Sequence, residues 1–365
     1  RIVIPKYKFI DDPNIQDMGV QIDIPMGYDF ETVTLYRTKL PNTEVTVYLI
    51  DNEKLYGRDG IYGNRSTPEF MDNPRRFALL NRGVFNLCRK LNWIPDILHC
   101  HDWPASLTPA LLHTNETTNG FEKTASVFTI HNLGYQGIFS KHDIHYTQLD
   151  WNDLVDPSTE FKETLNFLQI GILHANALTT VSPTYAEEIK QSEHGVGMDT
   201  LLRRREADLF GILNGIDYNE WSPETDVNLD YTFSHRDLSN KWQVKRILQQ
   251  ETGLEVRTDV PLIGMVSRLV EQKGFAELCG PEYGSLPRML EKLPVQFVIL
   301  GSGERWCEEE LQKLSAAFPN LAAYVTFDNR MAHLIEAGSD FFLMPSRYEP
   351  CGLNQMYSLR YGTIP

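Results

Sequence analysis

Short apolar segments that end in polar or glycine-containing loops alternate with amphipathic segments along most of this 365-residue chain. Residues 126–130 (SVFTI) have the apolar and β-branched composition of a buried strand. Residues 74–91 carry apolar side chains at the three- and four-residue spacing of a helix. Strand, loop and helix repeated in this order are typical of parallel sheets with helices on both faces. The pattern therefore predicts an α/β fold made of doubly wound sheets.

The alternation runs in two series. In the first series we expect strands at 45–50, 95–100, 126–130 and 177–181, with helices at 74–91, 107–113, 165–174 and from Pro183 onward. In the second series we expect strands at 261–266, 295–300, 323–327 and 341–344, with helices at 238–251, 305–318, 331–337 and 353–361.

A polar stretch with few apolar side chains separates the two series. It opens with the turn NGID at residues 214–217, which predicts a hinge near residues 214–222. We therefore expect two Rossmann-like domains, 1–217 and 218–365, that face each other across a cleft. Open sheets of this kind bind ligands at the carboxyl ends of their strands, so the loops that follow strands are the first candidates for a site.

Charge and composition exclude several classes of function. The formal net charge of −15 disfavours a general nucleic-acid binder, which needs basic surface for the phosphates. No apolar run reaches the roughly 18–20 residues that cross a bilayer, so we expect no membrane partner. The five cysteines are odd in number and form no CxxC pair, which favours a reducing, cytoplasmic compartment.

Two loops of the first series carry polar candidates. His99, His101 and Asp102 end one predicted strand. His99 and His101 could ligate a metal, although no third ligand is obvious. Asp102 could instead cap the next helix. The interpretation we favour is a polar wall of the cleft. His131 follows another strand, and the two glycines after it allow close backbone approach to a ligand. A histidine in this position can also be purely structural.

Two loops of the second series carry candidates for anion binding. Arg268 and Lys273 follow a strand and can converge on a diphosphate leaving group, on which charge builds up in the transition state. The alternative is a solvated pair of surface cations. Gly301 and Gly303 lie between a strand and a helix, where they either cradle a phosphate or form a tight turn.

The loop between the predicted strand 341–344 and the predicted helix 353–361 holds the last candidates. Glu349 can accept hydrogen bonds from sugar hydroxyls, or it can simply favour the dipole of the following helix. Backbone N–H groups near Gly352 can bind a phosphate. No histidine dyad with Cys351 is evident, so we interpret this cysteine as a small packing residue rather than a nucleophile.

Seven segments in these loops together resemble one enzyme family, the bacterial glycogen synthases and plant starch synthases. They are HDWPASLTPALL, FTIHNLGYQG, TVSPTYAEEI, ILNGID, SRLVEQKG, VILGSGE and PSRYEPCGL, in the order that the family has. The resemblance implies two Rossmann-like domains of the glycosyltransferase-B type with the active site between them. It also implies transfer of glucose from ADP-glucose to the 4-hydroxyl at the non-reducing end of an α-1,4-glucan, with retention of configuration.

The resemblance assigns roles to individual residues. It makes His131 the essential histidine beside the anomeric centre and Asp102 the aspartate that lines the same cleft. Arg268 and Lys273 correspond to the pair that holds the diphosphate, and Glu349 to the glutamate that orients the donor glucose. Because two cations balance the diphosphate, we expect neither a metal nor a cofactor. The remaining residues expected to bind substrate are Asn132, Asn214, Gly301, Gly303, Phe327, Cys351, Gly352 and Leu353.

The chain departs from the family pattern at three points. The family usually places a tyrosine on the adenine, and Phe327 stands at that position, which keeps the ring but removes the hydroxyl. The family also begins with a Lys-x-Gly-Gly-Leu loop and continues into a Thr-Gly-Gly-Leu segment. Neither occurs here, so we expect the chain to be truncated at both ends.

Other functions remain open from the sequence. A related two-domain sugar transferase, of the sucrose or trehalose type, would use another acceptor, and the HNLGYQG and YEPCGL segments argue against it. A non-catalytic module that binds glycogen or maltooligosaccharide would not need the diphosphate clamp. The sequence favours ADP-glucose over UDP-glucose as donor without deciding between them, and a plant source would place the enzyme in the plastid.

Overall fold

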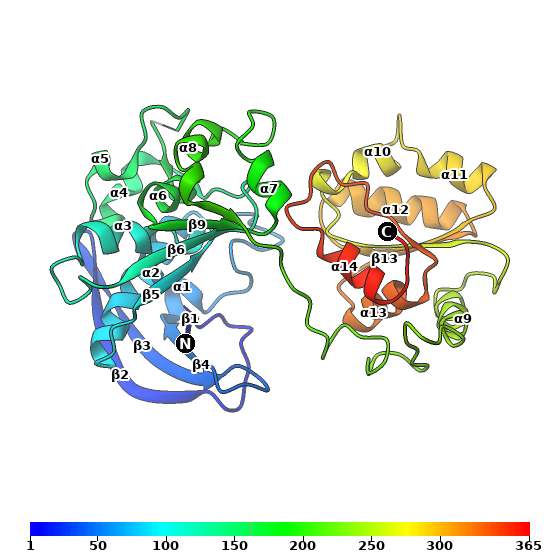
Figure 1. The fold of residues 1–365 in the computed structure, drawn as a ribbon, viewed down its shortest axis with the longest axis horizontal. Coiled ribbons are helices and arrows are strands. Elements are labelled where there is room, and N and C mark those ends of the chain that lie inside the picture. The colour runs from blue at the N-terminus through cyan, green and yellow to red at the C-terminus, as the bar shows by residue number, and fades with distance from the viewer. Residues whose placement is uncertain (162) are drawn as a thin grey trace. The chain divides into compact units, whose positions relative to one another are not determined.

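The computed structural model describes residues 1–161 and 163–365, and these form two compact units, Arg1–Leu213 and Asn214–Pro365 (Figure 1). The domain boundary expected from the sequence lay between residues 217 and 218.

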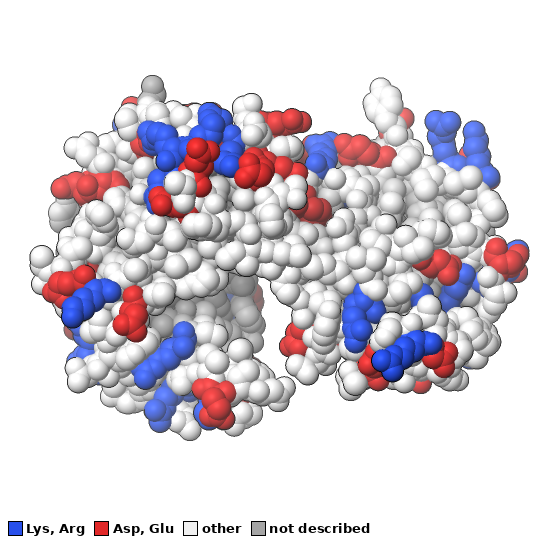
Figure 2. All heavy atoms as spheres, viewed as in Figure 1, with Lys and Arg blue, Asp and Glu red and all other residues white. Residues whose placement is uncertain are grey.

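Among the described residues, no helix combines the length and the apolar character needed to span a bilayer. On the face of the molecule in Figure 2, acidic and basic side chains are interspersed rather than gathered into a basic track.

The first unit opens with a mixed four-stranded sheet in the order β1-β4-β3-β2. Its strands are β1 (Ile2–Pro5), β2 (Gln16–Met26), β3 (Asp29–Lys39) and β4 (Thr46–Asp51). β1 pairs with β4 in parallel, whereas β3 pairs with both β4 and β2 in antiparallel register. Strand β4 was expected from the sequence, but the long β2–β3 pair was not. Side chains of β2 and β3 alternate between exposed and buried, as expected for strands with one face on the core.

The second sheet of this unit is parallel throughout, in the order β10-β9-β6-β5. Its strands are β5 (Ile97–His101), β6 (Ala125–Ile130), β9 (Ala177–Thr180) and β10 (Leu209–Gly211). A two-stranded pair, β7 (Ile138–Phe139) and β8 (Leu165–Asn166), lies outside it. The helices of the unit are α1 (Glu53–Tyr56), α2 (Asn73–Lys90), α3 (Leu107–Thr114), α4 (Ile144–Thr147), α5 (Trp151–Leu154), α6 (Phe167–His174), α7 (Pro183–Glu188) and α8 (Asp199–Arg204), with 3₁₀ turns η1 (Trp103–Ala105), η2 (Lys141–Asp143) and η3 (Glu206–Asp208).

Helix α2 is the central element of the first unit, because side chains on nearly all of its sides are buried. A Cβ on Gly83 would lie 2.8 Å from a methyl group of Ile50, so glycine lets α2 pack closely on β4. Elsewhere on the helix, the ring of Phe77 meets the ring of Trp103 edge-on, with centroids 4.6 Å apart. The helix therefore links the first sheet to the segment that follows β5, where one of the candidate loops begins.

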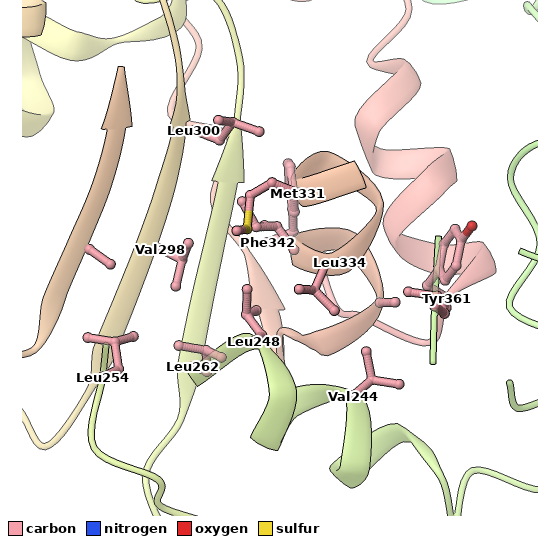
Figure 3. Close-up of a cluster of buried hydrophobic side chains, with 14 of the residues drawn as sticks. Val244, Leu248, Leu254, Leu262, Val298, Leu300, Met331, Leu334, Phe342 and Tyr361 are labelled. Carbon is pink, nitrogen blue, oxygen red and sulfur yellow. The ribbon is translucent and has the colours of Figure 1, made fainter. Parts of the chain in front are cut away.

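The second unit is a parallel sheet in the order β13-β12-β11-β14, covered by helices on both faces. Its strands are β11 (Leu262–Val266), β12 (Gln296–Gly301), β13 (Leu321–Val325) and β14 (Phe341–Phe342). Its helices are α9 (Lys241–Glu251), α10 (Phe275–Cys279), α11 (Leu286–Lys292), α12 (Arg305–Ala317), α13 (Asn329–Gly338) and α14 (Leu353–Arg360), with the turn η4 (Glu271–Lys273). Side chains from α9, α13 and the sheet form one buried cluster (Figure 3), and α10, α11 and α12 form another with the strands.

The expected α/β alternation is confirmed. Apart from elements that were not expected, such as the β2–β3 pair, the differences lie at the ends of elements. The predicted helix 165–174 begins two residues later, because Leu165 and Asn166 pair with β7 and the side chain of Asn166 then caps the helix. The predicted strand 323–327 ends at Val325, which leaves Phe327 in the loop before α13. Local periodicity locates an element, whereas its ends depend on partners that are distant in the sequence.

Candidate functional site

Asp102 lies directly after β5 and joins two loops of the first unit. Its backbone N–H donates to Thr129 O at 2.9 Å, and its Oδ1 accepts a hydrogen bond from the backbone N–H of His131 at 2.8 Å. The carboxylate makes no capping bond to η1, so the capping interpretation was wrong. Burial raises the pKa of the Asp102 carboxyl, and the N–H groups of His131 and Asn132 oppose that shift. The backbone of Asp102 has φ 55° and ψ −178°, a strained conformation for a residue with a side chain.

Three imidazole rings lie side by side next to this carboxylate. His101 Nδ1 is 3.0 Å from His131 Nε2, and the rings of His99 and His101 have centroids 4.2 Å apart. His99 Nε2 also contacts Thr129 Oγ1 at 2.7 Å. Partial desolvation and the two neighbouring imidazoles lower the pKa of His101 to about 4. In the part of the chain that the structure describes, no three His, Cys, Asp or Glu side chains are arranged to hold a metal ion.

Packing explains much of the composition of the loop after His131. Gly137 has φ 62°, and a Cβ there would lie 2.5 Å from the ring of Trp103. Gln136 is buried, where its amide donates to Leu133 O at 3.2 Å and accepts from Asn166 Nδ2 at 2.7 Å. The loop is thus held firmly, and this glycine serves the close approach of an indole ring.

Asn132 turns its side chain back into the same loop, where Oδ1 accepts from the backbone N–H of Gly134 at 2.9 Å. The amide therefore shapes the turn that follows His131. A substrate-binding role for Asn132 stays a prediction.

Arg268, Lys273 and Glu349 come together in the second unit, around a cavity of about 170 Å³. The Lys273 ammonium pairs with Glu349 Oε1, and the two side chains are only 19% and 20% exposed. Ser346 Oγ donates to the same oxygen at 2.7 Å. The cavity lies at the carboxyl ends of β11 and β14, and its lining residues are Met265, Val266, Ser267, Arg268, Lys273, Leu343, Met344, Ser346, Glu349 and Asn354.

Ser346 and Asn354 also line the cavity, although they were not expected from the sequence. Both flank the Glu349 segment, so the spacing alone could have suggested them. Asn354 lies in the first turn of α14 and donates from Nδ2 to Val266 O at 2.7 Å. It thereby ties the start of this helix to the end of β11.

Gly274 makes the contact between the two cavity loops possible. It has φ +75°, and a Cβ there would lie 2.0 Å from Pro345 O. Next to it, the backbone N–H of Arg347 donates to Gln272 O at 2.9 Å. The Arg347 side chain pairs with Glu271 and lies on the exposed side of the loop. Any larger residue at 274 would push apart the segments that carry Lys273 and Glu349.

Gly301 and Gly303 are not among the residues that line the cavity. A Cβ on Gly301 would lie 2.0 Å from Ser267 O, and one on Gly303 would lie 2.3 Å from Leu269 O. The backbone N–H of Leu269 donates to Ser302 O at 3.0 Å. Both glycines therefore allow the loop after β12 to run against the loop after β11, next to Arg268.

The remaining expected residues lie around α14 and the loop after β13. Gly352 has φ 74° and precedes Leu353, the first residue of α14. Burial raises the pKa of the Cys351 thiol, although hydrogen bonds with Asn214 partly offset this shift. A raised pKa disfavours a nucleophilic role for the thiol. The ring of Phe327 is 88% exposed, so it is open to a ligand.

Comparisons with known proteins agree with this geometry. Residues 1–204 match the family model described as the starch synthase catalytic domain. The chain is 50% identical over its whole length to a glycogen synthase of Treponema denticola, of which it covers 74%, and 44% identical to one of Anaeromyxobacter sp., of which it covers 75%. It also superposes, with a TM-score of 0.90 and 31% identity, on the catalytic domain of Starch Synthase IV from Arabidopsis thaliana bound to ADP and acarbose, covering all of this chain and 74% of that one.

Proposed function

The chain belongs to the glycogen and starch synthase family and serves glucosyl transfer in glycogen synthesis; from that premise we propose that its donor is ADP-glucose. The acceptor is the 4-hydroxyl at the non-reducing end of an α-1,4-glucan, glycogen or a maltooligosaccharide, and the anomeric configuration is retained. All five cysteines are free, in keeping with a reducing compartment, so we place the enzyme in the cytoplasm.

One observation carries the proposal: two cations and a carboxylate converge on a single cavity at the carboxyl ends of parallel strands. Arg268 and Lys273 supply positive charge for a diphosphate, and this placement is where open α/β sheets bind nucleotides. Lys273 and Ser346 both donate to Oε1 of Glu349, so Oε2 is the oxygen that we assign to the hydroxyls of the donor glucose. A module that only binds neutral glucan has no use for this pair of cations.

The chemical step follows from that charge arrangement. The bond between the glucosyl anomeric carbon and the diphosphate oxygen breaks, and its electron pair leaves with ADP. Arg268 and Lys273 stabilise the charge that develops on the diphosphate, as fixed cations do in a partly desolvated site. The acceptor 4-oxygen bonds to the same face of the anomeric carbon, and its proton passes to a diphosphate oxygen. Orientation and charge stabilisation thus account for the catalysis, without a covalent glucosyl-enzyme.

The first unit provides the acceptor side in this proposal. We assign His131 to the anomeric centre of the donor glucose; its backbone is held by Asp102, and its ring contacts His101. In the second unit, Asn214, Cys351, Gly352 and Leu353 complete the donor site. Phe327 stacks on the adenine, and its high exposure supports this role. The solved relative bound to ADP and acarbose supports both the nucleotide and the glucan.

The decisive experiment measures label transfer from ADP-glucose and, in parallel, from UDP-glucose into glycogen by the full-length protein. We expect incorporation from ADP-glucose that α-amylase releases. Lys273→Ala and Glu349→Ala should each lower kcat/KM by roughly 100-fold or more, the size of losing one transition-state contact. Lys313→Ala is the matched control, since Lys313 is 71% exposed on α12 and should leave activity unchanged.

Two results would contradict the proposal. Unchanged turnover in folded Lys273→Ala or Glu349→Ala would remove the cavity from the mechanism. No incorporation from either donor, by a folded protein that still binds glycogen and ignores ADP, would favour the glucan-binding module instead.

A further inference from the structure

Glu336 is a carboxyl group buried between α13 and α14, outside the donor cavity. It is only 1% exposed. Its Oε2 lies 2.7 Å from Ser358 Oγ, and Ser358 Oγ lies 2.7 Å from the backbone oxygen of Asn354, one turn earlier on α14. Three oxygen atoms therefore form a short chain from α13 to the first turn of α14.

The protons in this chain can be counted. A serine hydroxyl has one hydrogen to donate, and the carbonyl of Asn354 can only accept. If Glu336 were ionised, it too could only accept, and one of the two 2.7 Å contacts would join oxygen atoms with no proton between them. Both contacts are hydrogen bonds only when Glu336 is protonated and donates to Ser358, which then donates to Asn354 O.

The surroundings of Glu336 also favour the neutral acid. Its Oε1 is buried without a hydrogen-bond partner among the residues that the structure describes, and an ionised oxygen in that position would be costly. Burial raises the pKa of Glu336 to about 8, against the attraction of Lys241. The titratable groups that face it are Lys241 from α9 and, from α14 and its end, Tyr357 and Tyr361. Tyr361 and α13 lie in the cluster of Figure 3.

Lys241 shares this region and titrates in the same range. Its Nζ donates to Ala337 O at 2.7 Å, to Thr363 Oγ1 at 2.8 Å and to Tyr361 O at 3.1 Å, which uses all three ammonium protons. Burial lowers the pKa of Lys241 to about 8. Any test of Glu336 therefore has to compare variants in which Lys241 is unchanged.

We propose that Glu336 is a protonated positioning residue that holds the first turn of α14, and with it the donor cavity, through Ser358. The link to the cavity is Asn354, which lines it and donates to Val266 O at 2.7 Å. Glu349 lies in the loop that leads directly into this turn. When Glu336 loses its proton, Ser358 turns its hydrogen toward the new carboxylate and releases Asn354 O. The start of α14 then loses a contact, and the cavity binds the donor less tightly.

This inference rests on the proposed function, because it takes the cavity to be the ADP site. The test measures the Kd of ADP by calorimetry at about pH 7 and about pH 9, for the full-length protein and for Glu336→Gln. The glutamine amide can still donate to Ser358 but does not titrate near neutral pH. From about pH 7 to about pH 9, we expect the Kd of ADP to rise three- to tenfold more for the wild type than for Glu336→Gln. This is about the effect of one hydrogen bond. Glu309→Gln is the matched control and should follow the wild type, since the Glu309 side chain on α12 is 60% exposed.

A second measurement reads the proton without any ligand. A carboxyl with a raised pKa contributes stability below its unfolded-state pKa and loses it as the pH rises toward about 8. The Tm of Glu336→Gln minus that of the wild type should therefore grow from about pH 5 to about pH 9.

Each failure has its own signature. A Tm difference that does not change with pH overturns the protonated state of Glu336. The positioning role is overturned if the Tm difference grows with pH but ADP binding has the same pH dependence in the wild type and in Glu336→Gln. A protein that does not bind ADP even at about pH 7 overturns the proposed function and the positioning role with it, while the Tm comparison still reports the proton.

Discussion

The Asp102 carboxylate accepts a hydrogen bond from the backbone N–H of His131 at 2.8 Å, across two adjacent parallel strands. The side chain thus holds the backbone of the next loop rather than its own. It does so from a strained backbone conformation, with φ 55°, and strain of this kind costs about 1–3 kcal/mol. Surrounding packing must hold Asp102 in place, which is typical of residues that position a site.

The role of Asp102 as an acceptor leads to the first prediction. Asp102→Ala removes the acceptor and leaves the His131 N–H unsatisfied, so we expect a loss of about 1–3 kcal/mol in stability. A displaced His131 should lower kcat by about 100-fold. Asp102→Asn keeps Oδ1 and should stay within about tenfold of wild-type activity. Chemical denaturation and the glycogen-incorporation assay check both variants. If Asp102→Asn were as inactive as Asp102→Ala, the negative charge itself would be needed.

The second prediction concerns the close approach at Gly274. Gly274→Ala places a methyl group 2.0 Å from Pro345 O at φ +75°, so we expect the two cavity loops to separate and ADP binding to weaken by at least about tenfold. Gly253→Ala is the matched control, because Gly253 has φ +73° with nothing within 4 Å. Both variants lose about 1–2 kcal/mol for the backbone conformation. Equal ADP affinity in the two variants would show that the 274–345 contact does not shape the cavity.

The third prediction is a pH dependence that arises at His101. The pKa of His101 is lowered to about 4 in the folded protein. As the pH falls, the unfolded chain therefore takes up this proton before the folded protein does. The free energy of unfolding decreases as a result, between the ordinary pKa of histidine and about pH 4. Protonation also puts an N–H on His101 Nδ1, so that nitrogen can no longer accept a hydrogen bond from His131 Nε2. We expect kcat/KM to fall over the same range, and His101→Gln to lose that part of the profile. If kcat/KM of His101→Gln fell at acid pH as it does in the wild type, the contact between His101 and His131 would not be the cause of the pH dependence.

The fourth prediction tests the exposed ring of Phe327. Its side chain is 88% exposed, so Phe327→Ala should leave the Tm unchanged. Loss of a base–aromatic stack should weaken ADP binding by roughly tenfold or more. Phe327→Tyr keeps the ring and should bind ADP within about threefold of the wild type. Tyr283→Ala, at a residue 87% exposed in the same unit, should bind ADP normally. Normal ADP binding by Phe327→Ala would place the base elsewhere.

Several parts of the site could be predicted from the sequence because they depend on local pattern. Apolar periodicity located the strands, and the strand ends then identified the loops that carry Lys273 and Glu349. The antiparallel β2–β3 pair was not predicted from the sequence. Each of its strands gains stability mainly from the neighbour beside it rather than from its own residues.

The sequence by itself determined the α/β alternation, the two series and the chemical character of the candidate loops. These follow from residue type and spacing, which a linear chain displays directly. Only the tertiary structure decided what each group does. His101 meets His131 across 30 positions in the chain, and the proton that we assign to Glu336 depends on its burial and on the hydroxyl of Ser358 from α14. Protonation, tautomer and close approach depend on neighbours and burial, and these exist only once the chain has folded.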